Sequence, residues 1–174
     1  MLKRDIDEEL AMYDVEESSA INALIIIILL QHMPKCTLSQ LACASYLVRF
    51  TNVLSKLLNN QTKVDFLKGI PYWEFGNLDT VLSPYIIQKF DTRFLRGIKE
   101  LLAKNLIHID KNNVSLACPP KIELGNDDFK HIQHKAYYAS LVVMNKNNSE
   151  LVEQIYRIVG EEQWQNLYLS TASH

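Results

Sequence analysis

The stretch from Phe90 to Leu116 constrains the fold most, because an amphipathic helical pattern runs directly into a strand–turn–strand pattern. Asp91 is a good N-cap, and Phe90 is placed to form a hydrophobic staple with Leu95. From Thr92 to Lys104 one face of the expected helix is apolar, with Phe94, Leu95, Ile98, Leu101 and Leu102 at helical spacing. The pattern therefore predicts an amphipathic helix whose apolar face packs inward.

Asn105 predicts the end of this helix, because asparagine tolerates the left-handed backbone conformation found at helix C-caps. The segments 106–109 and 114–116 are then two short strands around a polar turn at 110–113. A helix followed by such a hairpin is typical of a winged-helix unit. A further helix at about 84–90, begun by Ser83-Pro84, would complete a helix-turn-helix.

Basic residues lie on the opposite side of the expected helix, interrupted by Glu100. The candidate contacts to DNA or to a protein partner are Lys89, Arg93, Arg96, Lys99, Lys104 and, in the turn, Lys111. Gly97 weakens the helix by about 1 kcal/mol relative to alanine, and suggests a close approach of another backbone. The helix is either a recognition helix in a DNA groove or part of a scaffold for protein contacts. The net charge of −2 argues against strong DNA binding by the chain alone.

Charge is unevenly distributed along the 174 residues. Residues 1–34 carry two bases and seven acids, all before residue 18, whereas residues 35–157 carry sixteen bases and eleven acids. We expect residues 1–17 to be an acidic arm. Such an arm is either a solvated leader or a segment that docks on a basic partner or on the chain's own basic face.

The remaining pattern predicts further helices around this unit. We expect helices from Ser18 or Ser19 to about Met33, from the Thr37–Gln40 capping box to about Asn59, around 64–67, from 126 to about 145, and from Ser149 to a stop at Gly160. The first is apolar nearly all round and should be central. In the fourth, the expected inner face is Phe129, Ile132, Ala136, Tyr137, Ser140, Leu141 and Met144. The fold class expected is mainly α with a small β-hairpin wing, a winged-helix-like core flanked by N- and C-terminal helices, in one domain over 18–164 with a tail at 165–174.

Aromatic residues gather at Tyr72, Trp73 and Phe75 and again at Trp164 and Tyr168. Either they pack over the core or they form exposed anchors for a partner, since Trp and Tyr dominate interface hot spots.

Neither a catalytic motif nor a cofactor-binding motif is present. The sequence lacks a phosphate-binding glycine loop, a dinucleotide fingerprint and a nucleophile elbow. His131 and His134 would supply half a metal site with no third ligand in view. Cys36, Cys43 and Cys118 form no CxxC pair and are expected to be reduced. The apolar run from Ala23 to Leu30 is too short to span a bilayer, and the acidic N-terminus is unlike a signal peptide. We therefore expect a non-enzymatic cytoplasmic protein without cofactor, metal or membrane contact.

The order of elements resembles the middle-component small subunits of bacterial three-component ABC systems, including those of Lamassu-type anti-phage systems. The likeness covers about residues 18–164. It lies in Ile21–Leu24 opening an apolar helix, the segment Phe94–Leu102, the wing at 106–116, the helix through Lys135–Leu141, and the closing Leu151–Gly160. The family often has proline after the asparagine of the first helix, where this chain has Ala23, so the sub-type stays open.

The resemblance implies a non-catalytic subunit that bridges an SMC- or RecN-like coiled-coil ATPase and an effector, often a nuclease, in anti-phage or anti-plasmid defence. DNA would then be contacted weakly or through the partners. The alternative is a winged-helix DNA-binding transcriptional regulator. An accessory subunit of a chromosome-condensing complex would share the first partner class.

Overall fold

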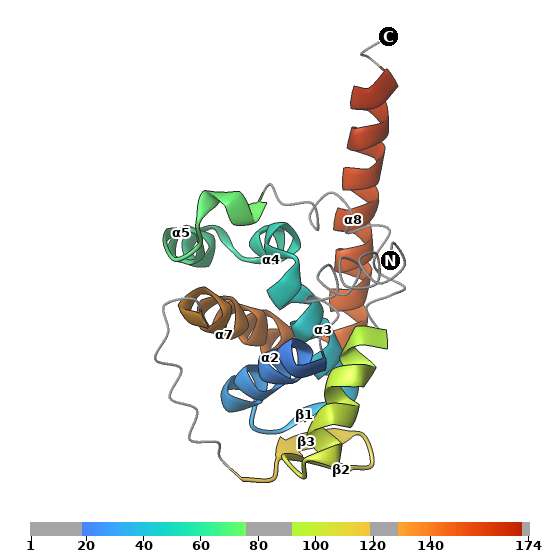
Figure 1. Ribbon diagram of the computed structural model, residues 1–174. Helices are drawn as coiled ribbons and strands as arrows, with labels where there is room; N and C mark the ends of the chain where they lie inside the picture. Colours follow the sequence, from blue (N-terminus) through green and yellow to red (C-terminus); the bar gives the residue numbers. More distant parts are fainter. Residues whose placement is uncertain (1–18, 76–91, 119–128, 172–174) are drawn as a thin grey trace, which may run out of the picture.

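The computed structural model describes residues 19–75, 92–118 and 129–171, with side chains described as far as Gly160. This part of the chain is mainly helical with a small antiparallel sheet, which confirms the expected fold class (Figure 1). The elements are α2 (Ser19–His32), β1 (Cys36–Thr37), α3 (Leu38–Arg49), α4 (Thr51–Leu57), α5 (Asn60–Lys68), the 3₁₀ turn η2 (Tyr72–Phe75), a helix over 92–103, β2 (Ile107–Asp110), β3 (Asn113–Leu116), α7 (Lys130–Asn145) and α8 (Asn148–Thr171).

Helix α2 lies at the centre, as its nearly continuous apolar sequence predicts. Ile28, Leu29 and Leu30 are fully buried, and both α3 and α7 pack on this helix. Helix α7 in turn contacts α4 and α5 on the far side. The core is therefore a layer of helices around α2 and α7, with the sheet at one end (Figure 1).

The helix expected to run from the capping box to Asn59 is in fact two helices. The capping box itself is confirmed: Thr37 Oγ1 accepts from Gln40 N at 3.2 Å, and Gln40 Oε1 accepts from Thr37 N at 2.9 Å. At Phe50 the backbone leaves the helical region, with φ −101° and ψ 81°. No proline or glycine marks this break. The Phe50 ring lies 4.5 Å from the Tyr46 ring one turn earlier, measured between centroids, and it is fully buried in the core, so core packing holds the corner.

The wing is confirmed and gains a third strand. Asn105 adopts φ 56°, the left-handed conformation expected where the preceding helix ends. Strands β2 and β3 pair antiparallel, with Ile109 opposite Val114. The two-residue strand β1 then pairs with β3, giving the order β1-β3-β2. The sequence did not reveal β1, because a two-residue strand has no detectable period.

The helix over 92–103 packs on α2 where Gly97 allows close approach. A Cβ placed on Gly97 would lie 3.0 Å from the Asn22 carbonyl carbon and 3.1 Å from Ala23 N, which confirms the role expected for this glycine. Phe94, Ile98 and Leu101 are buried, but Leu95 and Leu102 are exposed. The expectation that all five apolar residues face inward was therefore wrong.

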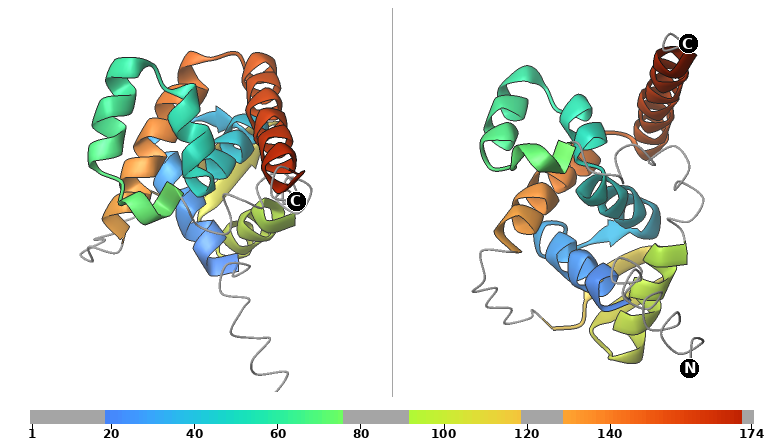
Figure 2. Two further views of the ribbon diagram at one scale, coloured as in Figure 1. Left: turned by 90° about the horizontal axis from the view of Figure 1, so that it is seen from above. Right: turned by 45° about the horizontal axis from the view of Figure 1, so that its top comes forward.

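Of two expectations for the C-terminal helices, one was partly right and one was wrong. The predicted inner face of α7 is only partly right: Ala136 and Ser140 are buried, and Ile132 and Leu141 pack partly against the core, but Tyr137 and Met144 are exposed. Lys135, Tyr138 and Val142 are buried instead. Helix α8 passes through Gly160 without a break. A glycine that ends a helix usually adopts a positive φ, and no glycine in the described part of the chain does so. The C-terminal half of α8 projects away from the body (Figure 2). The expected helix at 84–90 and the staple residue Phe90 lie outside the described residues.

Candidate partner-binding site

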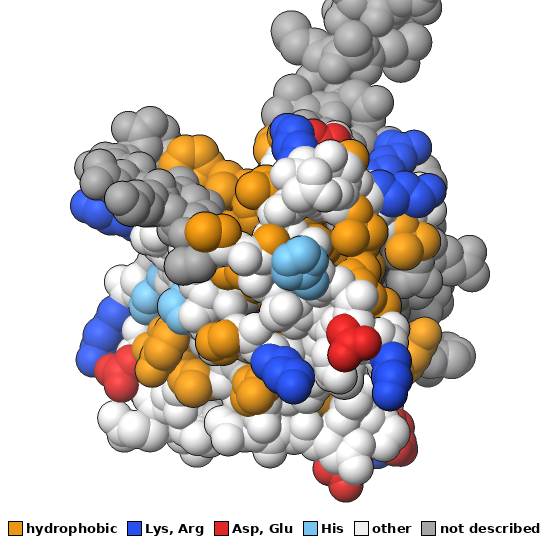
Figure 3. All heavy atoms as spheres, turned by 90° about the horizontal axis from the view of Figure 1, so that it is seen from below, with side chains coloured by type: hydrophobic (Ala, Val, Ile, Leu, Met, Phe, Trp, Pro, Cys, Tyr) orange, Lys and Arg blue, Asp and Glu red, His pale blue; other side chains and the backbone are white. Residues whose placement is uncertain are grey.

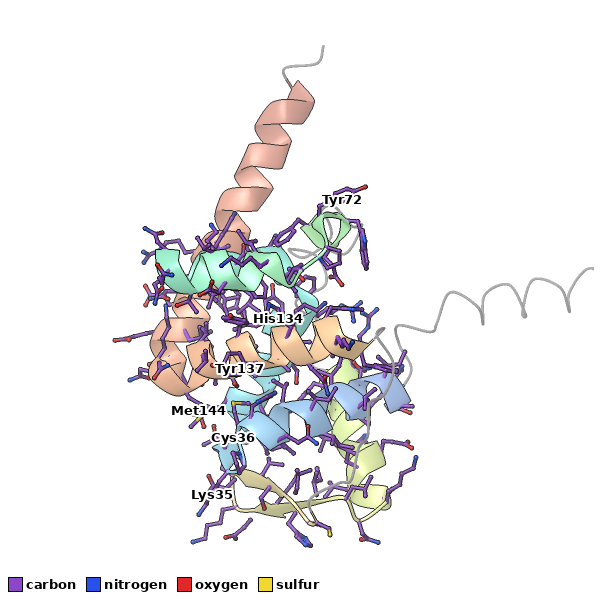
Figure 4. All side chains as sticks on the ribbon, turned by 90° about the vertical axis from the view of Figure 1, so that its left-hand side faces the viewer. Lys35, Cys36, Tyr72, His134, Tyr137 and Met144 are labelled. Atoms are coloured by element: carbon purple, nitrogen blue, oxygen red, sulfur yellow. The ribbon has the colours of Figure 1, made fainter. Side chains whose placement is uncertain are left out.

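An aromatic ledge formed by Tyr72 and Trp73 is the most exposed aromatic feature in the described part of the chain. Their exposed fractions are 88% and 55%, on the 3₁₀ turn η2. Figure 4 shows Tyr72 pointing away from the body at the tip of this turn. Phe75, the third residue of the expected cluster, packs partly against the core instead. Phe75 therefore packs over the core, whereas Tyr72 and Trp73 are exposed, as an anchor for a partner would have to be.

The ledge is fixed by buried residues on both sides of it. Ile70 is buried before the turn, and Glu74 is buried within it. The Glu74 carboxylate accepts from Lys135 Nζ of α7 at 3.1 Å and from Thr51 Oγ1 of α4 at 3.3 Å. A short turn tied to two helices loses little conformational freedom on binding, so its aromatic rings are pre-organised to contact a partner.

The Glu74–Lys135 ion pair is itself deeply placed, with both side chains only 8% exposed. Removing two charges from water costs several kcal/mol per ion, and attraction offsets that cost only with good geometry and further hydrogen bonds. His131 Nε2 lies 3.9 Å from Glu74 Oε1, and its ring meets Trp73 edge-on at 6.3 Å between centroids. This polar cluster was missed at the sequence level, because Lys135 follows no apolar period that predicts its burial.

A pocket of about 300 Å³ opens beside this cluster. Its walls combine apolar side chains with Glu74, Lys135 and Arg49. The hydroxyl of Ser45, also in the wall, is buried and has no hydrogen-bond partner in the described part of the structure. The apolar lining consists of Ile21, Ile25, Ile26, Val48, Phe94 and Ile132, with Trp73 at one side. A volume of this size is at the lower end of those that bind small ligands or peptide side chains.

The basic residues expected on the helix over 92–103 do not form one stripe. Arg96 and Lys99 are exposed, Arg93 is half-buried, and Lys104 pairs with Glu100 at 2.7 Å. Lys104 lowers the pKa of the Glu100 carboxyl group, mainly through the hydrogen bond that it donates and to a smaller extent through its positive charge. The exposed leucines 95 and 102 interrupt the cations further. On the face of the molecule seen from below, Lys and Arg side chains are scattered among hydrophobic ones and do not gather into one basic patch (Figure 3).

The remaining expected contacts lie apart from this face or outside it. Lys111 is exposed at the tip of the wing, where its φ is 56°. Trp164 and Tyr168 belong to the distal part of α8, of which only the backbone is described, and Lys89 lies outside the described residues. The structure therefore brings Tyr72 and Trp73 together and separates them from the wing.

His131 and His134 do not converge on a common point. His134 points between α5 and α7 (Figure 4), where Nε2 donates to the Phe66 carbonyl at 2.9 Å and the ring stacks on Phe66. His131 faces Glu74 and Trp73 instead. No group of three or more potential metal ligands occurs among the described residues.

The cysteines are unpaired and differ in environment. Cys36 is buried, which raises its thiol pKa to about 11, and burial also raises the pKa of Cys43. Cys118 is exposed. None of the helices in the described part of the chain is both long and apolar enough to cross a bilayer.

Comparison with known proteins returned no matching family model, no similar curated protein and no similar solved structure.

Proposed function

We propose that this chain is a non-catalytic bridging subunit that links a coiled-coil ATPase of the SMC or RecN class to an effector in bacterial defence against phages or plasmids. In this role the protein is cytoplasmic, binds no cofactor, and contacts DNA through its partners. The observation that carries the proposal is the aromatic ledge, two exposed rings held on a fixed turn.

Large exposed aromatic residues on a rigid mount are suited to protein binding. Trp and Tyr each bury a large apolar area with few rotatable bonds, and for that reason they are enriched at interface hot spots. Glu74 holds the ledge to both α4 and α7 through Thr51 and Lys135. A partner that covers Tyr72 and Trp73 would thus contact a surface coupled to the protein's core.

The class of partner rests on the resemblance of the element order to the middle-component subunits. What supports this class of partner is the order of an apolar central helix, a helix with a hairpin wing and two closing helices; α4, α5 and η2 lie between the first two of these. No nucleotide-binding loop occurs in the sequence, so ATP chemistry would belong to the partner.

A DNA-binding regulator is the second candidate, favoured by the exposure of Arg96 and Lys99 next to the wing. The exposed Leu95 and Leu102 on the same helix weigh against it, because apolar side chains make poor neighbours for phosphates. These leucines instead extend the surface available to a protein.

The test is co-purification of the tagged protein expressed with its flanking genes at moderate salt. We expect recovery of a long coiled-coil ATPase in a fixed ratio, and a loss of recovery of tenfold or more, roughly, for Tyr72→Ala with Trp73→Ala. Tyr156→Ala is the matched control, because Tyr156 is 58% exposed on α8, away from the ledge. Recovery of the protein alone, or of DNA alone, would refute the bridging role. Equal recovery with the ledge variant would remove the ledge from the interface.

A further inference from the structure

The pocket beside the ledge has a largely apolar wall that also contains two polar atoms with unused hydrogen-bonding capacity. Every residue that lines the pocket belongs to the part of the chain that the structure describes. Its volume is about 300 Å³. That is the share of about ten water molecules in the liquid, which suits a bicyclic ring system with a similar number of heavy atoms. The pocket can therefore hold a small molecule of this size.

The first of the two polar atoms is Glu74 Oε1. The other oxygen of this carboxylate, Oε2, accepts from Lys135 Nζ at 3.1 Å and from Thr51 Oγ1 at 3.3 Å. Among the described residues, Oε1 accepts no hydrogen bond, since His131 Nε2 lies 3.9 Å away, beyond hydrogen-bonding distance. Because Glu74 is nearly buried and lines the pocket, a donor would reach Oε1 from the pocket.

The second polar atom is the Ser45 hydroxyl of α3. Ser45 lines the pocket and is 7% exposed, and its Oγ has no hydrogen-bond partner among the described residues. A buried hydroxyl of this kind gives up its hydrogen bonds to water on folding and gains none in return. Since it has no bond to break, turning it toward a bound molecule requires only a change between staggered rotamers. A ligand would thus satisfy a group that folding alone leaves unsatisfied.

The charges at the pocket favour a neutral ligand. The Glu74 carboxylate is already paired with the Lys135 ammonium, and both side chains are nearly buried. A cation would meet that ammonium, whereas an anion would meet the free oxygen of the carboxylate. Arg49 also lines the pocket but already interacts within the protein. The charged residues that adjoin the lining residues in the sequence have both signs: Asp91, Arg93, Asp127, Asp128 and Lys130.

The apolar part of the lining favours a flat aromatic molecule. Ile21, Ile25 and Ile132 form an isoleucine wall, and the rings of Phe94 and Trp73 also line the pocket. Aromatic molecules pair with such rings edge-on or offset, and they bury a large apolar area. A rigid ring system also has no internal rotation to lose on binding. A flat ring with polar atoms at its edge therefore fits both the apolar wall and the two polar atoms.

We propose that this pocket binds a small, neutral, bicyclic heteroaromatic molecule with a ring N–H and a ring nitrogen acceptor, the chemistry of benzimidazole and of a free purine base. The ring packs between Trp73 and the isoleucine wall. Its N–H donates to Glu74 Oε1, and its acceptor nitrogen takes a hydrogen bond from Ser45 Oγ. Because Trp73 belongs to both the pocket and the ledge, a bound ring changes the surface that a partner of the ledge meets. The site does not depend on the bridging role, and its test uses no partner.

The test is a titration of the isotope-labelled full chain with benzimidazole, indole and indene, followed by amide chemical shifts. The three probes have nearly the same shape, but indole lacks the ring acceptor and indene lacks both polar atoms. We expect saturable shifts at 21–26, 45–49 and 131–135. For benzimidazole we expect a Kd of about 0.1–1 mM, as suits a ligand of about ten heavy atoms. The groove around Leu57 and Val142 shares no lining residue with the pocket and should not respond.

The order of the three affinities is the decisive result. Each hydrogen bond to the wall should tighten binding by about tenfold, so benzimidazole should bind more tightly than indole, and indole more tightly than indene. A pocket that selects only apolar surface would give the reverse order, because indene loses the fewest hydrogen bonds on leaving water. The reverse order, or the lack of a saturable shift with any probe at millimolar concentration, would overturn the proposal.

Two serine variants test the Ser45 contact separately from stability. Ser45→Ala removes a hydroxyl that has no partner, so the melting temperature should stay the same or rise. Its affinity for benzimidazole should fall about tenfold, whereas its affinity for indole, which lacks the acceptor, should not change. Ser140→Ala is the matched control, because Ser140 is also buried in a helix but donates to the Tyr137 carbonyl at 2.7 Å. It should bind both probes as the unsubstituted chain does. Unchanged benzimidazole affinity in Ser45→Ala would overturn the proposal.

A pocket-filling variant tests the location of the site. Ile21 lines the pocket and is exposed, so a larger ring at this position can extend over the pocket without entering the core. Ile21→Trp should abolish the saturable binding of benzimidazole. Val64→Trp adds the same ring at an exposed position of α5 that is not part of the pocket, and it should leave binding unchanged. Equal binding by the two variants would place the ligand elsewhere and overturn the proposal.

Discussion

At the scale of single residues, Glu74 and Lys135 make the strongest prediction about stability. Glu74→Leu leaves the Lys135 ammonium buried without its partner, so we expect a loss of about 3–5 kcal/mol in the free energy of unfolding. Glu74→Leu with Lys135→Met removes both charges and should recover most of that loss. Urea unfolding of the three proteins measures this. If the double variant were as unstable as the single one, the loss would come from packing and not from the unpaired charge.

The cysteines predict an order of chemical reactivity. Because the buried Cys36 thiol has a pKa of about 11, only about one molecule in a thousand carries its thiolate at pH 8. Cys118 is exposed and should react first with a thiol reagent in the native protein, and Cys118→Ser should abolish that fast phase. Cys36 should react only on unfolding or when the pH approaches 11. Fast labelling of Cys36 at pH 8 would show that the end of the sheet at β1 opens readily.

At the scale of elements, two helical glycines should respond oppositely to the same change. A Cβ at Gly97 would meet the α2 backbone at 3.0–3.1 Å and Ile26 Cδ1 at 2.9 Å. Gly97→Ala should therefore destabilise the protein by about 1–3 kcal/mol, as overpacking does. A Cβ at Gly160 meets nothing within 4 Å, so Gly160→Ala should stabilise α8 by roughly 0.5–1 kcal/mol. Thermal unfolding of both variants gives the sign of each change in stability. Stabilisation by Gly97→Ala would contradict the prediction and would mean that α2 can move aside.

The same elements show what local sequence specifies. The Thr37–Gln40 capping box and the Asn105 stop were predicted correctly, because each depends on hydrogen bonds or backbone angles within a few residues. The corner at Phe50 was not predicted, because it depends on contacts with distant elements. The continuous α8 was not predicted either, because no local constraint decides whether the helix ends at Gly160. Gly160 is compatible with a stop but does not require one. The burial of Lys135 was not predicted for a related reason, since it depends on Glu74, 61 positions away.

At the scale of the molecule, the sequence identified the aromatic ledge as a candidate but left its exposure open. The exposure of Tyr72 and Trp73 arises because Ile70 and Glu74 take the buried positions of the turn. Such a division among neighbouring residues is set by where α4 and α7 lie, which no local pattern specifies. The basic stripe shows the converse: its residues were identified, but only the structure shows that leucines and Glu100 interrupt it.

That interruption leads to a prediction for the whole protein and duplex DNA. We expect the isolated chain to bind with no more than non-specific affinity, a Kd of about 10⁻⁴–10⁻⁶ M at physiological salt. A regulator that used Arg96 and Lys99 on phosphates would bind more tightly, and Arg96→Ala with Lys99→Ala would reduce its salt slope by about 2. Lys63→Ala with Lys68→Ala removes the same charge from α5 and controls for net charge. Fluorescence anisotropy of labelled duplex DNA across a salt series distinguishes non-specific binding from binding by a regulator. Tight binding that the Arg96 and Lys99 variant abolishes, and the α5 variant does not, would replace the bridging role with the regulator. Weak binding that is equal in all three proteins leaves the exposed leucines of this helix to a protein partner.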